Sequence, residues 1–284
     1  GTRPDGYHEV SMLMQAISLC DIVTVGSDGD LRGCSALRGG PEGAGSILTP
    51  ADLEYGEKDL VWKAAVMMAG TFRPQSIIRT APGSTKSQSG GLQEIRGIHG
   101  VNISVEKHIP AAAGLAGGSA DAAAVMIGLA RLWNVLRAAE ERVLQTDSDC
   151  LLKILLPLAA ELGSDIPFCI ASQLGHPAAI ASGTGTDLEF VQPQDFGVEL
   201  FFSDFTVPDK TKSVYSELKD SDCTPLRDIR AFLAAQTLGE KRRLMGNHLQ
   251  APAERLMMRQ LGCPDTGSLR AAKKLPEDAM LCGA

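Results

Sequence analysis

The sequence lacks a long apolar run. A helix that crosses a bilayer needs about 20 mostly apolar residues. The strongest apolar segment, 151–162 (LLKILLPLAAEL), falls well short of this and contains Lys153 and Pro157. No signal or transit peptide is visible in the sequence. We therefore expect no membrane partner.

Paired cysteines are also lacking. The seven cysteines are odd in number, scattered along the chain, and contain no C-x-x-C pair. Such spacing predicts neither a zinc site nor a disulfide framework, and it favours a reducing compartment.

The sequence has no excess of positive charge. It contains 27 Lys and Arg against 34 Asp and Glu, a formal net charge of −7. Broad binding to nucleic acid or to an anionic membrane requires basic patches, so we expect no nucleic-acid partner. A polyanionic ligand would have to be held by backbone N–H groups and a few local cations.

The residues that are present predict an α+β protein. Hydrophobic residues make up 44% of the 284-residue chain, enough for one large domain or two ordinary ones. Strand and helix patterns occur in mixed order, without strict β-α alternation. We expect strands within 8–25, 101–110 and 198–207, and helices within 59–70, 119–136, 150–162 and 226–261.

Two domains are predicted, 1–177 and 178–284, with the boundary in the turn-rich segment 173–185. Two Gly/Ser-rich stretches, 26–46 and 79–91, are interpreted as surface insertions.

A glycine-rich segment, IPAAAGLAGGSADAAA (109–124), lies between a predicted strand and the best predicted helix. Gly114, Gly117 and Gly118 allow close backbone approach, and Ser119 is predicted at the helix N-cap with Asp121 in the first turn. A helix N-terminus behind glycines favours a phosphate ligand. The spacing fits neither the Walker nor the Rossmann pattern. The alternative is a glycine-rich turn without a ligand.

Two further segments contain candidate functional residues. In GSDIPF (163–168), Asp165 follows a helix stop and precedes a proline, so its carboxylate would be fixed and could accept a proton. The alternative is an ordinary cap or turn aspartate. In RPDGYHE (3–9), a turn presents Tyr7 and His8, which could stack on and hydrogen-bond a nucleobase. The alternative is a surface hairpin.

Together these three segments resemble the GHMP kinase superfamily, and within it the kinases of 4-diphosphocytidyl-2-C-methyl-D-erythritol. RPDGYHEV is the most discriminating match. The resemblance implies a two-domain fold, with a ribosomal protein S5 domain 2-like N-terminal domain and a ferredoxin-like C-terminal domain. It implies ATP and Mg²⁺ as cofactors and a small-molecule substrate. KDLVWKAA (58–65) is similar to the helix beside the adenine pocket, and DKTKSVY (209–215) to a substrate-contacting segment.

The resemblance also implies a role for each site residue. Asp165 would orient and deprotonate the attacking hydroxyl. The cytidine would be held by Tyr7, His8, Thr211 and Tyr215. The nucleotide would be held by Lys107, Pro110, Gly114, Leu115, Gly117, Gly118 and Ser119, with the Ser119 hydroxyl near Mg²⁺.

The sequence departs from the family pattern in two ways. Ala116 stands where the family usually has glycine, which is tolerated if its φ stays negative. The family's first strand carries a catalytic lysine in an "AK-N" signature, and its third glycine-rich motif comes near the end. Neither is present, so we expect a fragment with lowered turnover.

Two alternative functions stay open. One is another GHMP small-molecule kinase, and the other is a non-catalytic relative that binds a nucleotide or metabolite. We expect a monomer or weak homodimer. The insertions favour a plastid stroma location, with bacterial cytoplasm as the alternative.

Overall fold

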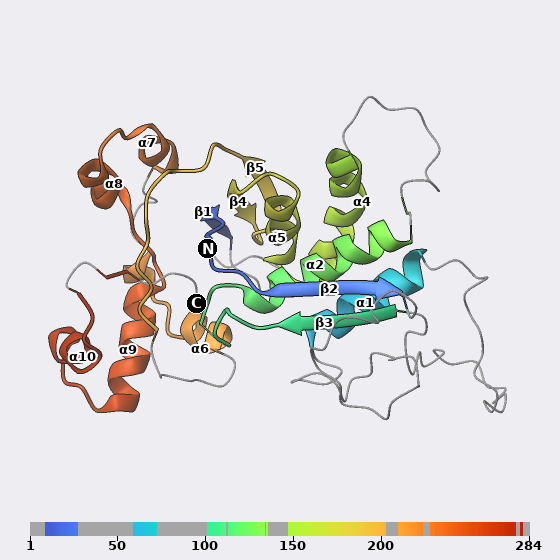
Figure 1. Cartoon of the computed structure of the whole chain (residues 1–284). Helices are drawn as coiled ribbons and strands as arrows, with labels where there is room; N and C mark the ends of the chain where they lie inside the picture. Colours follow the sequence, from blue (N-terminus) through green and yellow to red (C-terminus); the bar gives the residue numbers. More distant parts are fainter. Residues whose placement is uncertain are drawn as a thin grey trace. The chain divides into compact units, whose positions relative to one another are not determined.

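The structure, a computed structural model, describes residues 9–27, 59–72, 101–111, 113–133, 135, 147–202, 210–223, 228–276 and 279–280. The chain divides into two compact units. Unit 1 comprises Gly1–Ile109 and Gly117–Pro193, and unit 2 comprises Pro110–Ala116 and Gln194–Ala284. Figure 1 shows the elements, and each unit is described by itself.

The described part of unit 1 contains two antiparallel sheets. In the first, the strand order is β1 (Val10–Gln15), β4 (Ala178–Gly183), β5 (Asp187–Phe190). In the second, β2 (Ile22–Ser27) pairs with β3 (Val101–Glu106). The predicted strands within 8–25 and 101–110 are confirmed. The first Gly/Ser-rich stretch begins inside β2, and the rest of both stretches lies outside the described residues.

The register of β4 explains why unit 1 extends beyond residue 177. Val10 pairs with Gly183 and Gln15 with Ala178, so the chain after 177 returns to the sheet that β1 begins. The boundary in the structure falls after Pro193, later than the predicted division.

The described helices of unit 1 are α1 (Leu60–Phe72), α2 (Gly117–Leu132), α4 (Asp147–Leu162) and α5 (Ile166–Gln173). Helix α2 packs against α1, α5 and β2, and Figure 1 shows it lying along β2. The largest fully buried side chains of the unit include Met68, Met126, Leu129, Leu155 and Ile170. The helix predictions within 59–70, 119–136 and 150–162 are confirmed. Within α1, for example, the buried residues Val61, Ala65 and Met68 recur at helical spacing. Pro157 lies inside α4 without ending it.

The described part of unit 2 contains helices and irregular chain. Its elements are α6 (Lys210–Ser216), the 3₁₀ turn η4 (Asp220–Asp222), α7 (Ile229–Ala234), α8 (Leu238–Leu244), α9 (Gln250–Leu261) and α10 (Thr266–Ala272). The helix prediction within 226–261 is confirmed. A small core joins Val214 of α6 to Ala253 and Leu256 of α9.

The predicted strand at 198–207 is wrong over its described residues, 198–202, which have no regular structure. Val198 and Phe202 are about half exposed. A strand needs a neighbour that takes up its backbone hydrogen bonds, and the described residues of unit 2 provide no strand beside this segment. Residues 203–207 lie outside the described part of the chain.

In the part of the chain that the structure describes, no helix combines the length and the hydropathy that a bilayer crossing requires.

Candidate active site

The glycine-rich segment leads directly into α2. Gly117 and Gly118 form the start of the helix, and Ser119 is inside its first turn. The predicted N-cap position of Ser119 is therefore wrong, because the helix begins earlier than the capping pattern indicated. The first turn of a helix has free N–H groups and the positive end of the dipole, so this end favours an anion.

The loop before α2 contains two residues in the left-handed region. The φ angles of Gly114 and Ala116 are 77° and 54°. Alternating left-handed residues turn successive backbone N–H groups into a concavity that suits an anion. The φ of Ala116 is positive, so the condition under which its methyl group would be tolerated is not met, and the residue is strained here.

Lys107 follows β3 and reaches two carboxylates. Its Nζ lies 2.5 Å from Asp21 Oδ2 and 2.7 Å from Asp121 Oδ2. Asp21 also accepts the backbone N–H groups of His108 at 2.5 Å and Ile109 at 2.7 Å. Burial works against the charged ammonium, but the hydrogen bonds to Asp121 and Asp21 outweigh it and raise the pKa of Lys107. Because 43% of its side chain is exposed, this ammonium remains accessible to a ligand.

Gly117 brings Lys107 close to the start of α2. A Cβ at position 117 would lie 2.9 Å from Ile109 Cγ2 and 3.6 Å from Lys107 Nζ. Glycine therefore permits a close approach that any other residue would block. The geometry supports Lys107 as a cation beside the anion-favouring helix end.

Asp121 is the buried member of the Lys107 cluster. The residue is 4% exposed, and its Oδ1 has no hydrogen-bond partner. Burial raises the pKa of Asp121 to about 6, against the opposing effect of Lys107. The sequence analysis placed this residue in the first turn, but it begins the next turn and faces inward.

Asp165 lies immediately before α5, at the N-cap position. Its backbone is helical (φ −87°, ψ −19°), and its side chain makes no capping hydrogen bond. The side chain therefore does not cap the helix, but Asp165 lies in a turn, so the alternative of an ordinary turn aspartate stays open. Burial raises the pKa of Asp165, while a hydrogen bond with Ser164 works in the opposite direction. A carboxylate with a raised pKa is a better proton acceptor.

Cys169 connects the two aspartates. Burial raises the pKa of its thiol to about 12, and the negative charges of Asp165 and Asp121 add to this effect. Both carboxylates therefore act on one point between α5 and α2. Gln173 Nε2 also donates to Ala120 O at 2.9 Å, which fastens α5 to the start of α2.

The remaining predicted residues fall into two groups. Tyr7 and His8 lie outside the described residues. Thr211 and Tyr215 lie on α6 in unit 2, Thr211 exposed and Tyr215 half-buried. Pro110 is exposed and Leu115 half-buried in the loop before α2.

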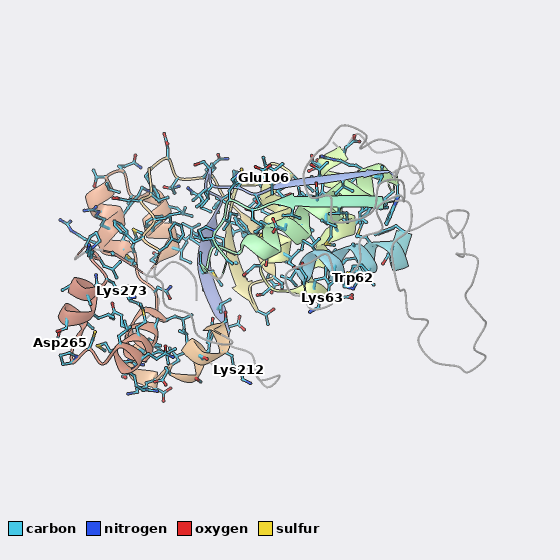
Figure 2. All side chains as sticks on the ribbon, turned by 60° about the horizontal axis from the view of Figure 1, so that its bottom comes forward. Trp62, Lys63, Glu106, Lys212, Asp265 and Lys273 are labelled. Carbon is cyan, nitrogen blue, oxygen red and sulfur yellow. The ribbon has the colours of Figure 1, made fainter. Side chains whose placement is uncertain are left out.

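An open, mostly apolar pocket of about 510 Å³ lies along α1, between that helix and Leu162 of α4. Trp62 and Lys63, labelled in Figure 2, contribute to its lining. The resemblance places the adenine pocket beside this helix. Among the described residues, the lining of the pocket comes from α1 and Leu162 and includes none from the glycine-rich segment.

Sequence reasoning missed Asp21. The residue lies between Cys20 and the apolar run of β2, and its carboxylate receives Lys107. A charged residue directly before an apolar strand was the available signal, although its partner is 86 positions away.

Comparisons with known proteins identify the family of this chain. Residues 85–173 match the family described as GHMP kinases N terminal domain. The 4-diphosphocytidyl-2-C-methyl-D-erythritol kinase of Nocardia farcinica is 34% identical over 259 residues, which cover 88% of this chain and 67% of that protein. The chain belongs to the 4-diphosphocytidyl-2-C-methyl-D-erythritol kinase family. The resemblance drawn from the three motifs is confirmed.

Two further members of this family extend the agreement. The kinase of the same name from Synechocystis sp. is 39% identical over 192 residues, and the match covers 66% of this chain but 45% of that protein. A crystal structure of 4-(cytidine 5′-diphospho)-2C-methyl-D-erythritol kinase matches with a TM-score of 0.55 and 27% identity, over 92% of this chain and 77% of the other. The predicted α+β GHMP kinase fold is confirmed.

Proposed function

We propose that this chain transfers the γ-phosphoryl group of ATP to the 2-hydroxyl of 4-diphosphocytidyl-2-C-methyl-D-erythritol, a step of non-mevalonate isoprenoid biosynthesis. The observation that carries the proposal is Asp165. Its carboxylate is partly buried, has a raised pKa, and does not cap the helix that it precedes. That helix packs against α2, whose N-terminal turn follows the glycine-rich loop.

The reaction needs positioning and charge neutralisation more than covalent work by the protein. The hydroxyl oxygen of the substrate attacks the γ-phosphorus, the bond to the β-phosphate oxygen breaks, and the hydroxyl proton passes to Asp165. The N–H groups at the start of α2 and the Lys107 ammonium hold the phosphates.

Magnesium would enter as Mg-ATP. The described residues contain no group of three or more His, Cys, Asp or Glu side chains that could hold a metal ion. The phosphate oxygens would therefore supply most of the ligands, with the Ser119 hydroxyl as the nearest protein donor. When bound, the ion neutralises charge on the transferred group.

The cytidine would be held by the remaining predicted residues. Tyr7 and Tyr215 would enclose the base from its two faces, His8 would hydrogen-bond it, and Thr211 would lie nearby. Aromatic faces suit nucleobases, and an imidazole can read a polar base edge.

The test is a phosphoryl-transfer assay with ATP and the cytidine substrate, comparing the chain with Asp165→Asn. We expect the variant to lose about 10²- to 10⁴-fold in turnover, the usual contribution of a general base. The dissociation constant for ATP should stay unchanged. Asp147→Asn, an exposed aspartate in the first turn of α4, is the matched control and should retain turnover.

Stability separates a catalytic loss from a folding defect. Because burial raises the pKa of Asp165, its charge is unfavourable in the folded state at neutral pH. A neutral Asn should raise the free energy of unfolding by on the order of 1 kcal/mol. If Asp165→Asn kept full turnover, the proposal would be wrong. If the wild-type chain bound ATP without any turnover, the non-catalytic alternative would replace it.

We also propose a plastid stroma location, with bacterial cytoplasm as the alternative, and a monomeric or weakly dimeric state. The 39% identity with a cyanobacterial relative is consistent with both locations. A fluorescent fusion of the full-length gene product would distinguish them.

A further inference from the structure

Helix α6 is too short to be stable alone. It has seven residues, Lys210–Ser216, and contains both Thr211 and Tyr215. Isolated helices shorter than about 12 residues are marginal in water, so tertiary contacts must hold α6 in place. The position of any group on α6 therefore depends on what it packs against.

An apolar contact provides the first of these anchors. Val214 is 2% exposed and packs with Ala253 and Leu256 of α9, with Leu249 at the edge of the cluster. Val214 immediately precedes Tyr215, so α9 supports the turn of α6 that contains the predicted cytidine residue.

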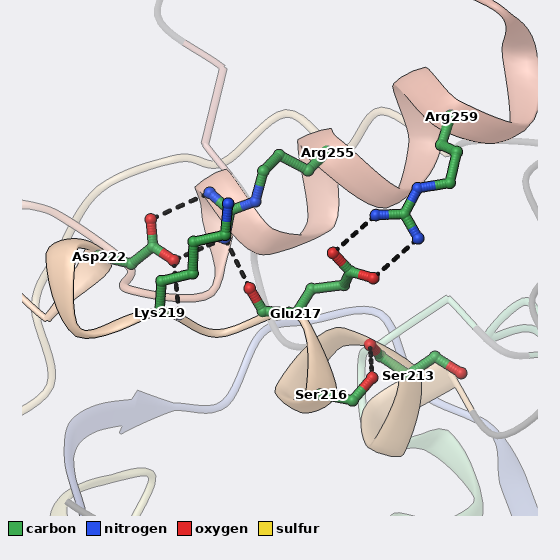
Figure 3. A network of polar contacts seen from close by, with 7 residues as sticks. All are labelled: Ser213, Ser216, Glu217, Lys219, Asp222, Arg255 and Arg259. Atoms are coloured by element: carbon green, nitrogen blue, oxygen red, sulfur yellow. Dashed lines mark hydrogen bonds and ion pairs between the residues drawn. The ribbon is translucent and has the colours of Figure 1, made fainter.

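Two arginines of α9 provide the second anchor, at the C-terminal end of α6 (Figure 3). Arg255 Nη2 donates to the Glu217 carbonyl oxygen at 2.7 Å and to Asp222 Oδ2 at 2.6 Å, while its Nη1 donates to Asp222 Oδ1 at 3.0 Å. One turn further along α9, Arg259 forms a two-pronged pair with the Glu217 carboxylate, at 2.9 and 2.8 Å.

These contacts also suit the charge at that end of α6. Cations near a helix C-terminus interact favourably with the dipole. The hydrogen bond from Arg255 lowers the pKa of Asp222 to about 2, and the one from Arg259 lowers the pKa of Glu217. Both carboxylates are therefore ionised across the physiological range and hold the arginines continuously.

We propose that Arg255, assisted by Arg259, is a positioning residue for substrate recognition: it fixes α6 so that Thr211 and Tyr215 are presented to the cytidine. This inference rests on the proposed function. A guanidinium is required because it reaches three acceptors in a planar fork, which a lysine ammonium does not reproduce.

Amide hydrogen exchange over residues 210–219 tests the positioning without any ligand. Arg255→Ala should speed exchange there, with smaller effects for Arg255→Lys and Arg259→Ala, because Arg259 is 64% exposed. Arg270→Ala is the matched control. Arg270 of α10 pairs with Glu254 of α9 at 3.0 Å, and its side chain is 22% exposed, close to the 25% of Arg255. It also donates to the carbonyl oxygens of Pro276 and Ala279, which follow α10.

Binding measurements then test the functional part. In Arg255→Ala the dissociation constant for 4-diphosphocytidyl-2-C-methyl-D-erythritol should rise about tenfold, while that for ATP stays within about twofold. A merely destabilising change would affect Arg270→Ala equally. If Arg255→Ala unfolds, Arg259→Ala and Arg255→Lys carry the same test.

Two results would overturn the inference. One is an exchange rate over 210–219 that matches the control, and the other is faster exchange with unchanged affinity for the cytidine substrate. If the wild-type chain did not bind this substrate, the proposed function and the substrate part of the inference would both fall. The exchange result would still decide whether the arginines position α6.

Discussion

At the scale of single residues, Ala116 shows how a small side chain can conflict with the loop that contains it. Its φ of 54° lies where glycine is favoured, and the sequence alone indicated only that a family glycine had been replaced. Left-handed backbone costs a non-glycine residue about 1–2 kcal/mol. The loop keeps this conformation in spite of the cost, which is typical of functional segments.

Replacing Ala116 by glycine should stabilise the chain. The relief of strain exceeds the entropy that glycine adds to the unfolded state, so we expect a gain of about 0.5–1 kcal/mol in the free energy of unfolding. Ala113→Gly in the same loop is the control, because φ is not positive there, and it should destabilise by a similar amount. Urea unfolding measures the free energy of unfolding of both variants. If the two substitutions changed it by the same amount in the same direction, Ala116 would not be strained.

Residue identity predicted the candidate site unevenly. Asp165 could be predicted because it follows a glycine stop and precedes a proline, a local pattern. The Asp121 oxygen that has no hydrogen-bond partner could not be predicted, because its environment depends on how α2 packs against other elements. For the ion pair of Lys107 with Asp21, the only local signal is a charged residue directly before an apolar strand, and nothing local indicates its partner 86 positions away.

At the scale of elements, α2 depends on one glycine for its contact with β2. A Cβ at Gly128 would lie 2.8 Å from Val25 Cγ2 and 3.0 Å from Val25 Cβ. Valine is stiff at χ1, so it cannot move aside easily. The close approach of helix and strand therefore requires glycine at this position.

Gly128→Ala should accordingly destabilise the chain by about 1–3 kcal/mol through overpacking. Gly70→Ala provides the contrast. A Cβ at Gly70, on α1, meets nothing within 4 Å, so the higher helix propensity of alanine should stabilise by up to about 1 kcal/mol. Thermal unfolding of the two variants gives the sign directly. A stabilised Gly128→Ala would show that β2 yields to the helix.

Helices and strands were predicted correctly where the hydrophobic periodicity was strong. Predictions failed where the presence of a strand depends on pairing with a distant part of the chain. Strands β1, β2 and β3 have β-branched or apolar residues in recognisable runs. Strands β4 and β5 were missed, because β4 consists mostly of small residues, AAIASG, in a segment interpreted as a boundary. The apolar run at 198–202 has strand composition without a strand partner among the described residues.

At the scale of the whole molecule, the two units respond to acid in opposite directions and in different pH ranges. In unit 1, burial raises the pKa of Asp121 to about 6, and it also raises the pKa of Asp165. In unit 2, hydrogen bonds lower the pKa of each shifted carboxyl group: Glu217, Asp222, Glu240 and Asp265. A carboxyl group whose pKa is raised by folding destabilises the folded state once it ionises. A carboxyl group whose pKa is lowered by folding stabilises the folded state when it is ionised.

The signs set two pH windows. As pH falls from about 6 to 3.8, protonation of Asp121 removes an unfavourable buried charge, so unit 1 should gain stability. As pH falls from 3.8 toward 2, Asp222 loses its pairing with Arg255, so unit 2 should lose stability. The pKa of Asp21 is lowered, so protonation of Asp21 reduces the stability of unit 1 only in the second window, below pH 3.8.

Tryptophan fluorescence can follow unit 1 selectively, because both tryptophans of the sequence, Trp62 and Trp133, lie in it. The urea midpoint measured by fluorescence should rise as the pH is lowered from 7 to 5. In Asp121→Asn this rise should be smaller. Far-UV circular dichroism also reports the helices of unit 2. Below pH 3.8 it should show unfolding at a lower urea concentration than tryptophan fluorescence does. A fluorescence midpoint that falls steadily from pH 7 to pH 5 would contradict this assignment.

The thiol of Cys169 offers one more use of this arrangement. The thiol is buried, and burial raises its pKa to about 12, so it has almost no thiolate at neutral pH, whereas Cys20 and Cys223 are exposed. Alkylating reagents should therefore modify the exposed thiols first and reach Cys169 only when α5 separates transiently from α2. The rate of the slow labelling phase therefore measures how often α5 separates from α2.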